Sequence, residues 1–536
     1  MACYGGDLIL SAIKSLKYEL LVSMLGLVIW VSLFRTLKKN EKVTSYLPPG
    51  PRGLPLLGYL PFVRPDLHRF YAELAHAYGP IFSLRLGTKL CVVVSSPSLA
   101  KEIFKEQDTI FANPDAPVSG LIMGHGGSDI VWTPYGPRWR LVRKICVREV
   151  MASSRLDATY RIRRREVRDM VHDLYHHHKE GTPVDITETA FVTALNVISS
   201  MIWGGRLQGE EKLRVGSEFR RVVGDIVMLL AKPNVSDFFP LLARFDLQGV
   251  ARETKSKIQW LDRIIDPMIV ERLKIEWGQN KSQSSTQLHD PDILQTLVHI
   301  YKEGISDSEM SLTLNQIKGL IMNLVIGGTD TVSTTIEWTM AQMMKQPEIM
   351  RRAQKEVDQV VGLHQTVEEF HLHELRYLKA VVKEVLRLYS VAPILSPRSP
   401  SQTSILGGYT IPEGAQIIVN AWAIHRDPLS WEDPLEFRPE RFLTNDHISK
   451  PFLNISPINH DFRYIPFGSG RRMCVGIPLG ERMILLLLAT LLHSFDWQLP
   501  QGTELDMFEK FGIAMKKVVP LAVVPTPRLV DTKLYI

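Results

Sequence analysis

Residues 467–476 hold one cysteine among glycines and arginines and read Phe467-Gly468-Ser469-Gly470-Arg471-Arg472-Met473-Cys474-Val475-Gly476. A thiolate that binds iron must be deprotonated, and nearby positive charge and backbone N–H donors stabilise that state. Gly470 and Gly476 allow the backbone to turn tightly and to come close to a ligand. An apolar helical pattern over residues 477–492 follows directly and places a positive helix N-terminus near the sulfur. These features favour Cys474 as a metal ligand over the alternative, a buried structural cysteine in a glycine-rich turn.

The same positions match FxxGxRxCxG, the haem-binding signature of cytochromes P450. The chain resembles this family from about residue 48 to residue 536. The resemblance implies the cytochrome P450 fold and a bound haem b (iron protoporphyrin IX), with Cys474 as the axial ligand of the iron. It also implies that Arg472 neutralises a haem propionate through charge-assisted hydrogen bonds. The other haem contacts that it implies in this loop are Phe467, Gly470 and Gly476.

Two further motifs of the family occur in the family's order. Residues 384–387 read EVLR and resemble the ExxR motif, and residues 439–442 read PERF. A glutamate and an arginine three positions apart share a helix face and can pair. The spacing alone is weak, because Glu348 and Arg351 share it. By resemblance, Glu384, Arg387 and Arg441 form a buried triad that fixes the segment carrying the cysteine.

Three more residues match family positions that contact haem propionates. Residues 139–143 read WRLVR and resemble the WxxxR motif, which implies propionate contacts for Trp139 and Arg143. Residues 392–398 read APILSPR, and Arg398 occupies the position of a further propionate contact.

A long apolar helical pattern contains the sequence Gly327-Gly328-Thr329-Asp330-Thr331-Val332. Glycine destabilises a helix interior by about 1 kcal/mol relative to alanine, so two glycines favour a functional reason over a kink that merely packs. In the family resembled, these glycines open a groove over the haem where O₂ binds. Asp330 and Thr331 would be the acid and alcohol that deliver protons for O–O cleavage. Val332 departs from the usual threonine or serine, which removes an accessory hydroxyl and leaves the pair intact.

Hydrophobic periodicity predicts the secondary structure of the globular part. Helical patterns cover residues 161–175, 316–344 and 481–492, among others, and strand-like runs cover residues 81–86, 91–94 and 417–420. We expect a mostly α domain with a small β portion, preceded by a single N-terminal transmembrane helix.

An apolar run over residues 20–34 predicts a membrane anchor. Positive charge is heavier after the run than before it, and no small-residue cleavage site follows, which favours an anchor over a cleaved signal peptide. Because positive flanks stay cytosolic, we expect a single-pass protein of the endoplasmic reticulum membrane with its catalytic domain in the cytosol. The predicted division is a short N-terminal segment (1–19), the anchor (20–37), a basic and proline-rich hinge (38–55) and the haem-thiolate monooxygenase domain (56–536).

Composition excludes some classes of protein. The net charge of +6 is modest for 536 residues and argues against a dedicated nucleic-acid binder. The four cysteines show no paired spacing, which predicts no disulfide framework and favours a reducing compartment for the folded part.

The resemblance implies that the protein inserts one atom of O₂ into a small hydrophobic substrate. The sequence carries no flavin or nicotinamide fingerprint, so the electrons would come from NADPH through a separate NADPH–cytochrome P450 reductase. The acidic face of that reductase could dock on four basic residues, Arg138, Arg140, Lys144 and Arg148. Two alternatives from other classes are a haem-thiolate isomerase or dehydratase that needs neither O₂ nor reductase, and a haem-carrying sensor.

The segments that match the family's substrate-recognition regions are largely apolar and read Leu121-Ile122-Met123, Leu324-Val325-Ile326, Ile394-Leu395 and Ile513-Ala514. They offer no partner for a carboxylate or a phosphate. The whole sequence also looks like plant microsomal terpenoid and flavonoid hydroxylases. We therefore expect a terpenoid substrate, a sesquiterpene or diterpene hydrocarbon, with a flavonoid or another phenylpropanoid as the alternative.

Overall fold

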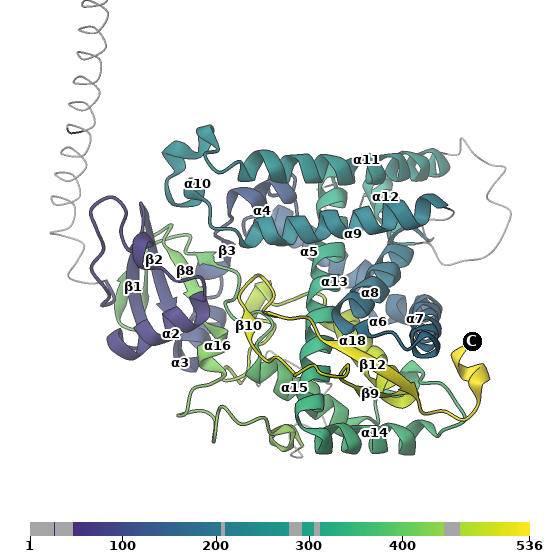
Figure 1. The fold of residues 1–536 in the computed structure, drawn as a ribbon. Coiled ribbons are helices and arrows are strands. Elements are labelled where there is room, and N and C mark those ends of the chain that lie inside the picture. Colours follow the sequence, from purple (N-terminus) through teal and green to yellow (C-terminus); the bar gives the residue numbers. More distant parts are fainter. Residues whose placement is uncertain (1–25, 27–46, 205–209, 278–291, 305–310, 444–460) are drawn as a thin grey trace, which may run out of the picture.

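The computed structural model describes residue 26 and residues 47–204, 210–277, 292–304, 311–443 and 461–536 (Figure 1). The predicted anchor over residues 20–37 lies outside the described residues, apart from Gly26. Three cysteines, Cys91, Cys146 and Cys474, are described, and all three are free thiols.

One long helix, α13 (Leu314–Lys345), passes through the middle of the molecule (Figure 1). Its start is fixed by a capping box, in which the Thr313 side chain accepts from the Gln316 backbone and Gln316 reaches back to Thr313. The helix confirms the pattern predicted over residues 316–344. Among the described helices, it packs against α8 (Ile186–Trp203), α12 (Ile293–Glu303), α14 (Pro347–Val361), α15 (Arg376–Leu388) and α18 (Ile477–Ser494).

The remaining helices surround this centre, and α9 and α11 cross above α13 in the view of Figure 1. Among them, α7 contains the predicted helix over residues 161–175. Their bounds are α2 (Leu67–Tyr78), α3 (Pro97–Lys101), α4 (Val118–Met123), α5 (Pro137–Ile145), α6 (Ser153–Ala158), α7 (Tyr160–Glu180), α9 (Glu210–Ala231), α10 (Val235–Phe238), α11 (Val250–Glu276) and α16 (Ala421–Ile424).

The β portion is small, as predicted, and its main sheet lies at one side of the helices (Figure 1). The main sheet has the order β1-β2-β8-β5-β3, in which only β2 and β8 run parallel. Its strands are β1 (Ile81–Leu86), β2 (Lys89–Val94), β3 (Asn113–Pro114), β5 (Arg398–Ser399) and β8 (Gln416–Val419). The other strands are β4 (Val184–Asp185), β9 (Phe495–Gln498) and β12 (Ala522–Pro527) in one sheet, and the hairpins β6 (Ser404–Leu406) with β7 (Tyr409–Ile411) and β10 (Glu509–Lys510) with β11 (Lys516–Lys517).

Two described helices, α8 and α18, are long and apolar enough to cross a membrane. However, 56% of the most apolar window of α8 and 72% of that of α18 are buried inside the molecule. Both helices pack on α13, so their apolar character is explained by the core of the domain.

The described part of the proline-rich hinge lies against strand β1. The Ser83 backbone N–H donates to the Pro49 carbonyl (2.8 Å), and the Ser83 hydroxyl donates to the Pro48 carbonyl (2.7 Å). These two hydrogen bonds fix residues 48–49 to the main sheet. The division of the chain between residues 55 and 56 stays a prediction.

Candidate functional site

The cysteine loop, residues 467–476, turns back on itself immediately before α18. Gly470 has a φ of +71°, and a Cβ at this position would lie 2.6 Å from the Phe104 carbonyl oxygen. Glycine is therefore required there by both conformation and space. The Cys474 backbone N–H donates to the Phe467 carbonyl (3.1 Å), which closes the loop.

The Cys474 side chain has exposed surface although protein surrounds it. Burial by the surrounding protein raises the pKa of this thiol. The backbone N–H groups of Gly476 and Ile477 and the charge of Arg143 act in the opposite direction and lower this pKa. These are the donors and the positive charge that a thiolate ligand needs.

Three arginines, Arg143, Arg398 and Arg472, bring more positive charge to the loop than nearby carboxylates balance. Burial lowers the pKa of Arg398 to about 10 and that of Arg472 to about 9, and repulsion from Arg398 contributes to the second shift. Asp108 lies 3.6 Å from Arg398, too far for a hydrogen bond, and Arg398 Nη1 and Asp108 Oδ1 are both buried without a hydrogen-bond partner. A pair of propionate carboxylates would supply the missing negative charge, so the residues present fit a haem.

Two of the side chains that we expect to contact propionates, Arg472 and Trp139, form hydrogen bonds with backbone carbonyls of the protein. Arg472 donates to the carbonyls of Ala112, Val131 and Thr133, and its guanidinium lies over the Trp139 ring at 4.9 Å. The Trp139 indole N–H donates to the Ile130 carbonyl (2.9 Å). Both side chains therefore fix residues 130–133 beside the cysteine loop, and their contact with a propionate stays a prediction.

The predicted oxygen-binding stretch presents a narrow exposed stripe on α13. Between residues 316 and 343, Gly327 and Thr331 are the exposed positions, and a spacing of four places them on one face of the helix. The Thr331 hydroxyl donates to the Gly327 carbonyl (2.6 Å). A Cβ on Gly327 would meet nothing within 4 Å, whereas a Cβ on Gly328 would lie 2.4 Å from Ile198 of α8. Only Gly327 opens the surface; Gly328 instead faces the end of the Ile198 side chain of α8, which corrects the expectation that both glycines open a groove.

Asp330 is buried, with 5% of its surface exposed, and forms an ion pair with Lys516 of β11. Sequence analysis did not find Lys516, which belongs to none of the family's motifs and reaches α13 only through the fold.

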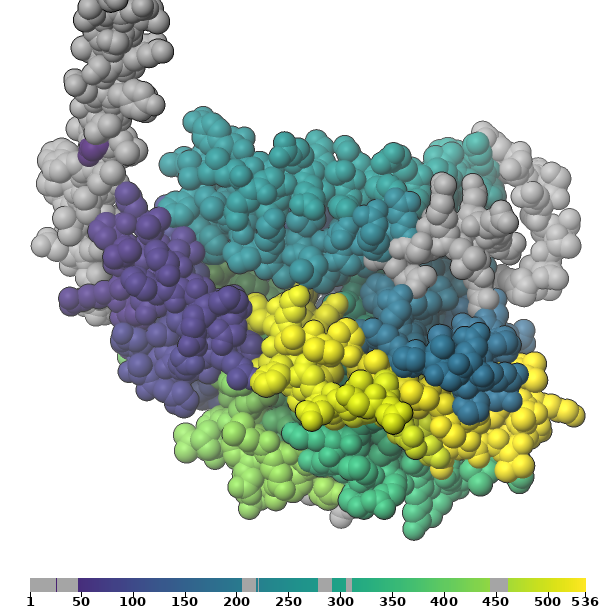
Figure 2. All heavy atoms as spheres, viewed as in Figure 1, coloured from purple at the N-terminus to yellow at the C-terminus, as the bar shows by residue number. Residues whose placement is uncertain are grey.

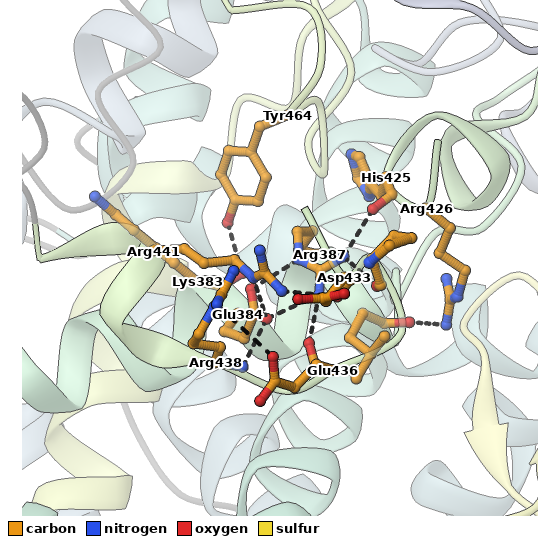
Figure 3. A network of polar contacts seen from close by, with 12 residues as sticks. Lys383, Glu384, Arg387, His425, Arg426, Asp433, Glu436, Arg438, Arg441 and Tyr464 are labelled. Carbon is orange, nitrogen blue, oxygen red and sulfur yellow. Dashed lines mark hydrogen bonds and ion pairs between the residues drawn. The ribbon is translucent and has the colours of Figure 1, made fainter. Parts of the chain in front are cut away.

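The Glu384–Arg387–Arg441 triad is formed as predicted (Figure 3). Arg387 Nε and Nη2 donate to the two oxygens of Glu384, each at 2.8 Å, and neither side chain is exposed. Arg441 Nε donates to Glu384 Oε1 (3.3 Å). Three further donations of Arg387 go to the backbone carbonyls of His425 (2.9 Å), Pro434 (2.8 Å) and Glu436 (3.0 Å).

His425, whose carbonyl accepts from Arg387 (Figure 3), also connects this network to the segment that precedes the cysteine loop. Burial lowers the pKa of His425 to about 3, so its ring is neutral and Nε2 accepts from the Ile465 backbone N–H (2.9 Å). The Ser390 hydroxyl lies 2.9 Å from the other ring nitrogen, and the Tyr464 hydroxyl donates to the Lys383 carbonyl (3.1 Å). The segment that enters the cysteine loop is thus tied to α15, as the predicted structural role of the triad requires.

Comparisons with known proteins agree with this site. The cytochrome P450 family matches residues 48–521. A flavonoid 3'-monooxygenase from Crocosmia x crocosmiiflora is 38% identical over 488 residues, which cover 90% of this chain and 93% of that protein. Geraniol 8-hydroxylase from Catharanthus roseus is 36% identical over 511 residues, which cover 95% of this chain and 99% of that protein.

A solved structure shows the same fold. A zebra fish cytochrome P450 with abiraterone superposes with a TM-score of 0.69 at 26% identity and covers 86% of this chain and 99% of that chain. Family members use haem b, O₂, hydrophobic substrates and electrons that a reductase passes on from NADPH. The chain therefore belongs to the cytochrome P450 family and is a haem-dependent monooxygenase.

Proposed function

We propose that the protein hydroxylates a terpenoid hydrocarbon, a sesquiterpene or a diterpene. The observation that carries this proposal is the apolar character of the predicted substrate segments, in which Leu121 and Ile513 expose 41% and 42% of their surface. Lys516 is the cation beside Asp330 and Thr331, and its charge is already neutralised by Asp330. An anionic substrate would lose its hydration without gaining a counter-charge. A hydrocarbon has no charge, so its burial carries no such desolvation cost. Geraniol 8-hydroxylase and a geranylhydroquinone 3''-hydroxylase, 36% and 37% identical, support a terpenoid-type substrate.

A flavonoid is the second candidate, and the 38% identity to a flavonoid 3'-monooxygenase favours it. Flavonoids carry several hydroxyl groups, each of which needs a polar partner once it is buried. A hydrocarbon fits the apolar segments better for that reason.

Substrate-binding spectra of the haem-loaded enzyme separate the two candidates. A panel of mono-, sesqui- and diterpenes, geraniol among them, should displace the water on the haem iron and shift the haem absorption at low concentration. Flavonoids should shift it only weakly. Saturable shifts with flavonoids alone would overturn the terpenoid proposal.

Asp330 and Thr331 are proposed as the proton-delivering pair. When bound, the haem supplies the binding and reductive activation of O₂, aided by the thiolate. The Thr331 hydroxyl lies on the exposed stripe of α13, next to the open position at Gly327. Asp330 is the adjacent residue and holds its carboxylate toward β11. A proton taken up by that carboxylate can pass to the hydroxyl side of the helix without reaching bulk solvent again.

Replacing Thr331 by alanine should uncouple NADPH oxidation from product formation. Product per NADPH should fall while hydrogen peroxide rises, because a positioned proton donor contributes about 10²- to 10⁴-fold to its step. The measurement is product, NADPH and peroxide in one reaction. Thr329→Ala is the matched control, because Thr329 makes the same type of hydrogen bond, to Val325, but is fully buried. Equal coupling in the two variants would remove Thr331 from proton delivery.

The predicted reductase-docking residues lie on α5 and on the π-helical segment Cys146–Val150 that follows it. Arg138, Arg140 and Arg148 are exposed, and Lys144 is half-buried. The same helix carries Arg143, whose charge acts on Cys474. A reductase bound here would be close to the thiolate side of the site, which supports this surface as the docking face.

An exposed apolar patch supports membrane association of the catalytic domain. We define the apolar patch as Leu56, Leu57, Phe62, Leu241 and Leu247, which expose 42–89% of their surface. Its two segments flank one turn, because the Gly87 N–H donates to the Leu57 carbonyl and the Thr88 N–H donates to the Phe238 carbonyl. Figure 2 shows the purple N-terminal segment beside the teal segment of α10 and α11. Such a patch on the surface is typical of a face that contacts lipid or protein, which fits a domain held at a membrane by the predicted anchor.

The expected orientation is single-pass, in the endoplasmic reticulum membrane, with the catalytic domain in the cytosol. Protease added to intact microsomes should therefore digest the catalytic domain, and the sequon at residues 454–456, outside the described residues, should carry no glycan. A second sequon, Asn234-Val235-Ser236, does not report the orientation, because the Asn234 residue is 2% exposed and its side chain caps α10. A protected domain or a glycan on Asn454 would reverse the orientation.

A further inference from the structure

Two histidines of α7, His172 and His176, face each other on the surface of the molecule. Their Nε2 atoms lie 3.2 Å apart, and the rings meet edge to face with their centroids 4.5 Å apart. The His172 side chain is 44% exposed, and His176 is exposed as well, so an ion can reach both rings from solvent. We propose that the two rings form a binding site for Zn²⁺ or a divalent transition-metal ion of similar chemistry.

The spacing of the two residues explains why their rings meet. Residues four positions apart lie on the same face of a helix, one turn above the other. Zinc holds imidazole nitrogens at about 2.0–2.1 Å in a tetrahedral arrangement, which places two such nitrogens about 3.3 Å apart. The 3.2 Å between the Nε2 atoms of His172 and His176 is close to that separation. The pair can therefore hold an ion with little movement of either ring.

A neighbouring carboxylate favours the form of His172 that binds a metal ion. Asp173 Oδ1 lies 3.7 Å from His172 Nδ1. Its charge favours a proton on Nδ1, which leaves the lone pair of Nε2 free for the ion. The same carboxylate also places a negative charge near the bound cation, which strengthens binding.

The type of ligand selects the type of ion. Imidazole nitrogens suit Zn²⁺, Cu²⁺ and Ni²⁺, whereas Mg²⁺ and Ca²⁺ prefer oxygen ligands. Within the residues that the structure describes, no group of three or more His, Cys, Asp or Glu side chains is arranged to hold a metal ion. Water would therefore complete the coordination at His172 and His176, so the site would exchange its ion with the solution.

The turn of α7 that carries the pair is held in place from its other side, beside the C-terminus of the chain (Figure 1). The Tyr175 ring stacks on the Tyr535 ring, with centroids 4.8 Å apart. His178 Nδ1 lies 3.1 Å from the Pro525 carbonyl oxygen of β12. The helix ends at Gly181, whose N–H donates to the His178 carbonyl (3.1 Å). Because the backbone is ordered before an ion binds, binding has a smaller entropy cost.

The alternative to a metal site is a hydrogen bond between two neutral rings, in which one nitrogen donates and the other accepts. Such a bond brings His172 and His176 equally close, but it gives the pair no affinity for a metal ion. The affinity of the protein for Zn²⁺ therefore separates the two alternatives.

The test is a Zn²⁺ titration by isothermal calorimetry of the haem-loaded, full-length enzyme without a histidine tag. His172→Ala and His176→Ala each remove one ligand. His177→Ala is the matched control, because it removes the adjacent histidine, whose Nδ1 lies 2.8 Å from the Thr182 hydroxyl instead. X-ray absorption at the zinc edge identifies the ligands of the bound ion, and the carbon monoxide band shows that each variant is folded and haem-loaded.

The unaltered enzyme and His177→Ala should bind one Zn²⁺ with two imidazole ligands, and excess Mg²⁺ should not displace it. His172→Ala and His176→Ala should each weaken this binding by about 100-fold or more, because the second ligand of a chelate binds within the same molecule. The carbon monoxide band should be the same in all of them. The proposal is wrong if either of these two variants binds Zn²⁺ as the unaltered enzyme does, or if His177→Ala loses the ion as they do.

Discussion

Cys474→Ser is expected to abolish the red-shifted carbon monoxide band of the reduced enzyme and, with it, all turnover. The band reports a thiolate on ferrous haem, and a serine hydroxyl does not ionise at neutral pH even where backbone donors and Arg143 favour an anion. The measurement is the difference spectrum of the reduced protein with and without carbon monoxide.

Two other cysteine variants serve as controls for this prediction. Cys91→Ser lies on β2, where its side chain donates to Gln416 (3.0 Å), and should keep the full band. Burial raises the pKa of Cys146 to about 12, and the charge of Cys474 adds to this shift. Cys146→Ser should also keep the band. If the band survived in Cys474→Ser and vanished in Cys146→Ser, Cys146 and not Cys474 would be the ligand of the iron.

Arg387→Met is expected to destabilise the protein by about 3–5 kcal/mol and to leave little haem-loaded enzyme. Arg387 and Glu384 are both fully buried, so loss of the guanidinium takes the close counter-charge from the Glu384 carboxylate, which keeps only the contacts with Arg441 and the Arg438 N–H, and removes a donor from three backbone carbonyls. That cost is a large share of the roughly 5–15 kcal/mol by which folded domains are stable. Thermal unfolding and the yield of carbon monoxide-binding protein measure the effect.

Arg351→Met is the matched control for Arg387→Met. Arg351 pairs with Glu348 at the same spacing, but the two side chains are 66% and 83% exposed. Exposed pairs contribute roughly 0–1 kcal/mol, so this variant should behave as the unaltered protein. Similar losses in both variants would show that the triad has no special structural weight.

The part of the site that the sequence predicted is local. The cysteine loop and the Glu384–Arg387 pair depend on residues within a few positions of one another, and the resemblance to the family singled this pair out from others of the same spacing. The long helix over residues 316–344 and the strand over residues 81–86 were predicted for the same reason, since hydrophobic periodicity reflects one element at a time.

The part that escaped prediction depends on contacts between distant segments. Lys516 reaches Asp330 only because the β10–β11 hairpin folds onto α13, and His425 reaches Ile465 only because both lie beside α15. The two glycines of α13 look alike in sequence, and only the approach of Ile198 from α8 separates the role of Gly328 from that of Gly327. Burial of the Asn234 sequon is likewise a property of the fold.

Hydroxylation with labelled dioxygen tests the central claim most directly. The haem-loaded enzyme, NADPH and NADPH–cytochrome P450 reductase are combined with ¹⁸O₂ and the terpene or flavonoid that binds best, and the product is weighed by mass spectrometry. We expect one ¹⁸O atom in each product molecule and no product when NADPH or the reductase is omitted. Product without ¹⁸O, or product formed without NADPH, would contradict the monooxygenase assignment and favour an isomerase or dehydratase; spectral binding without any product would favour a sensor.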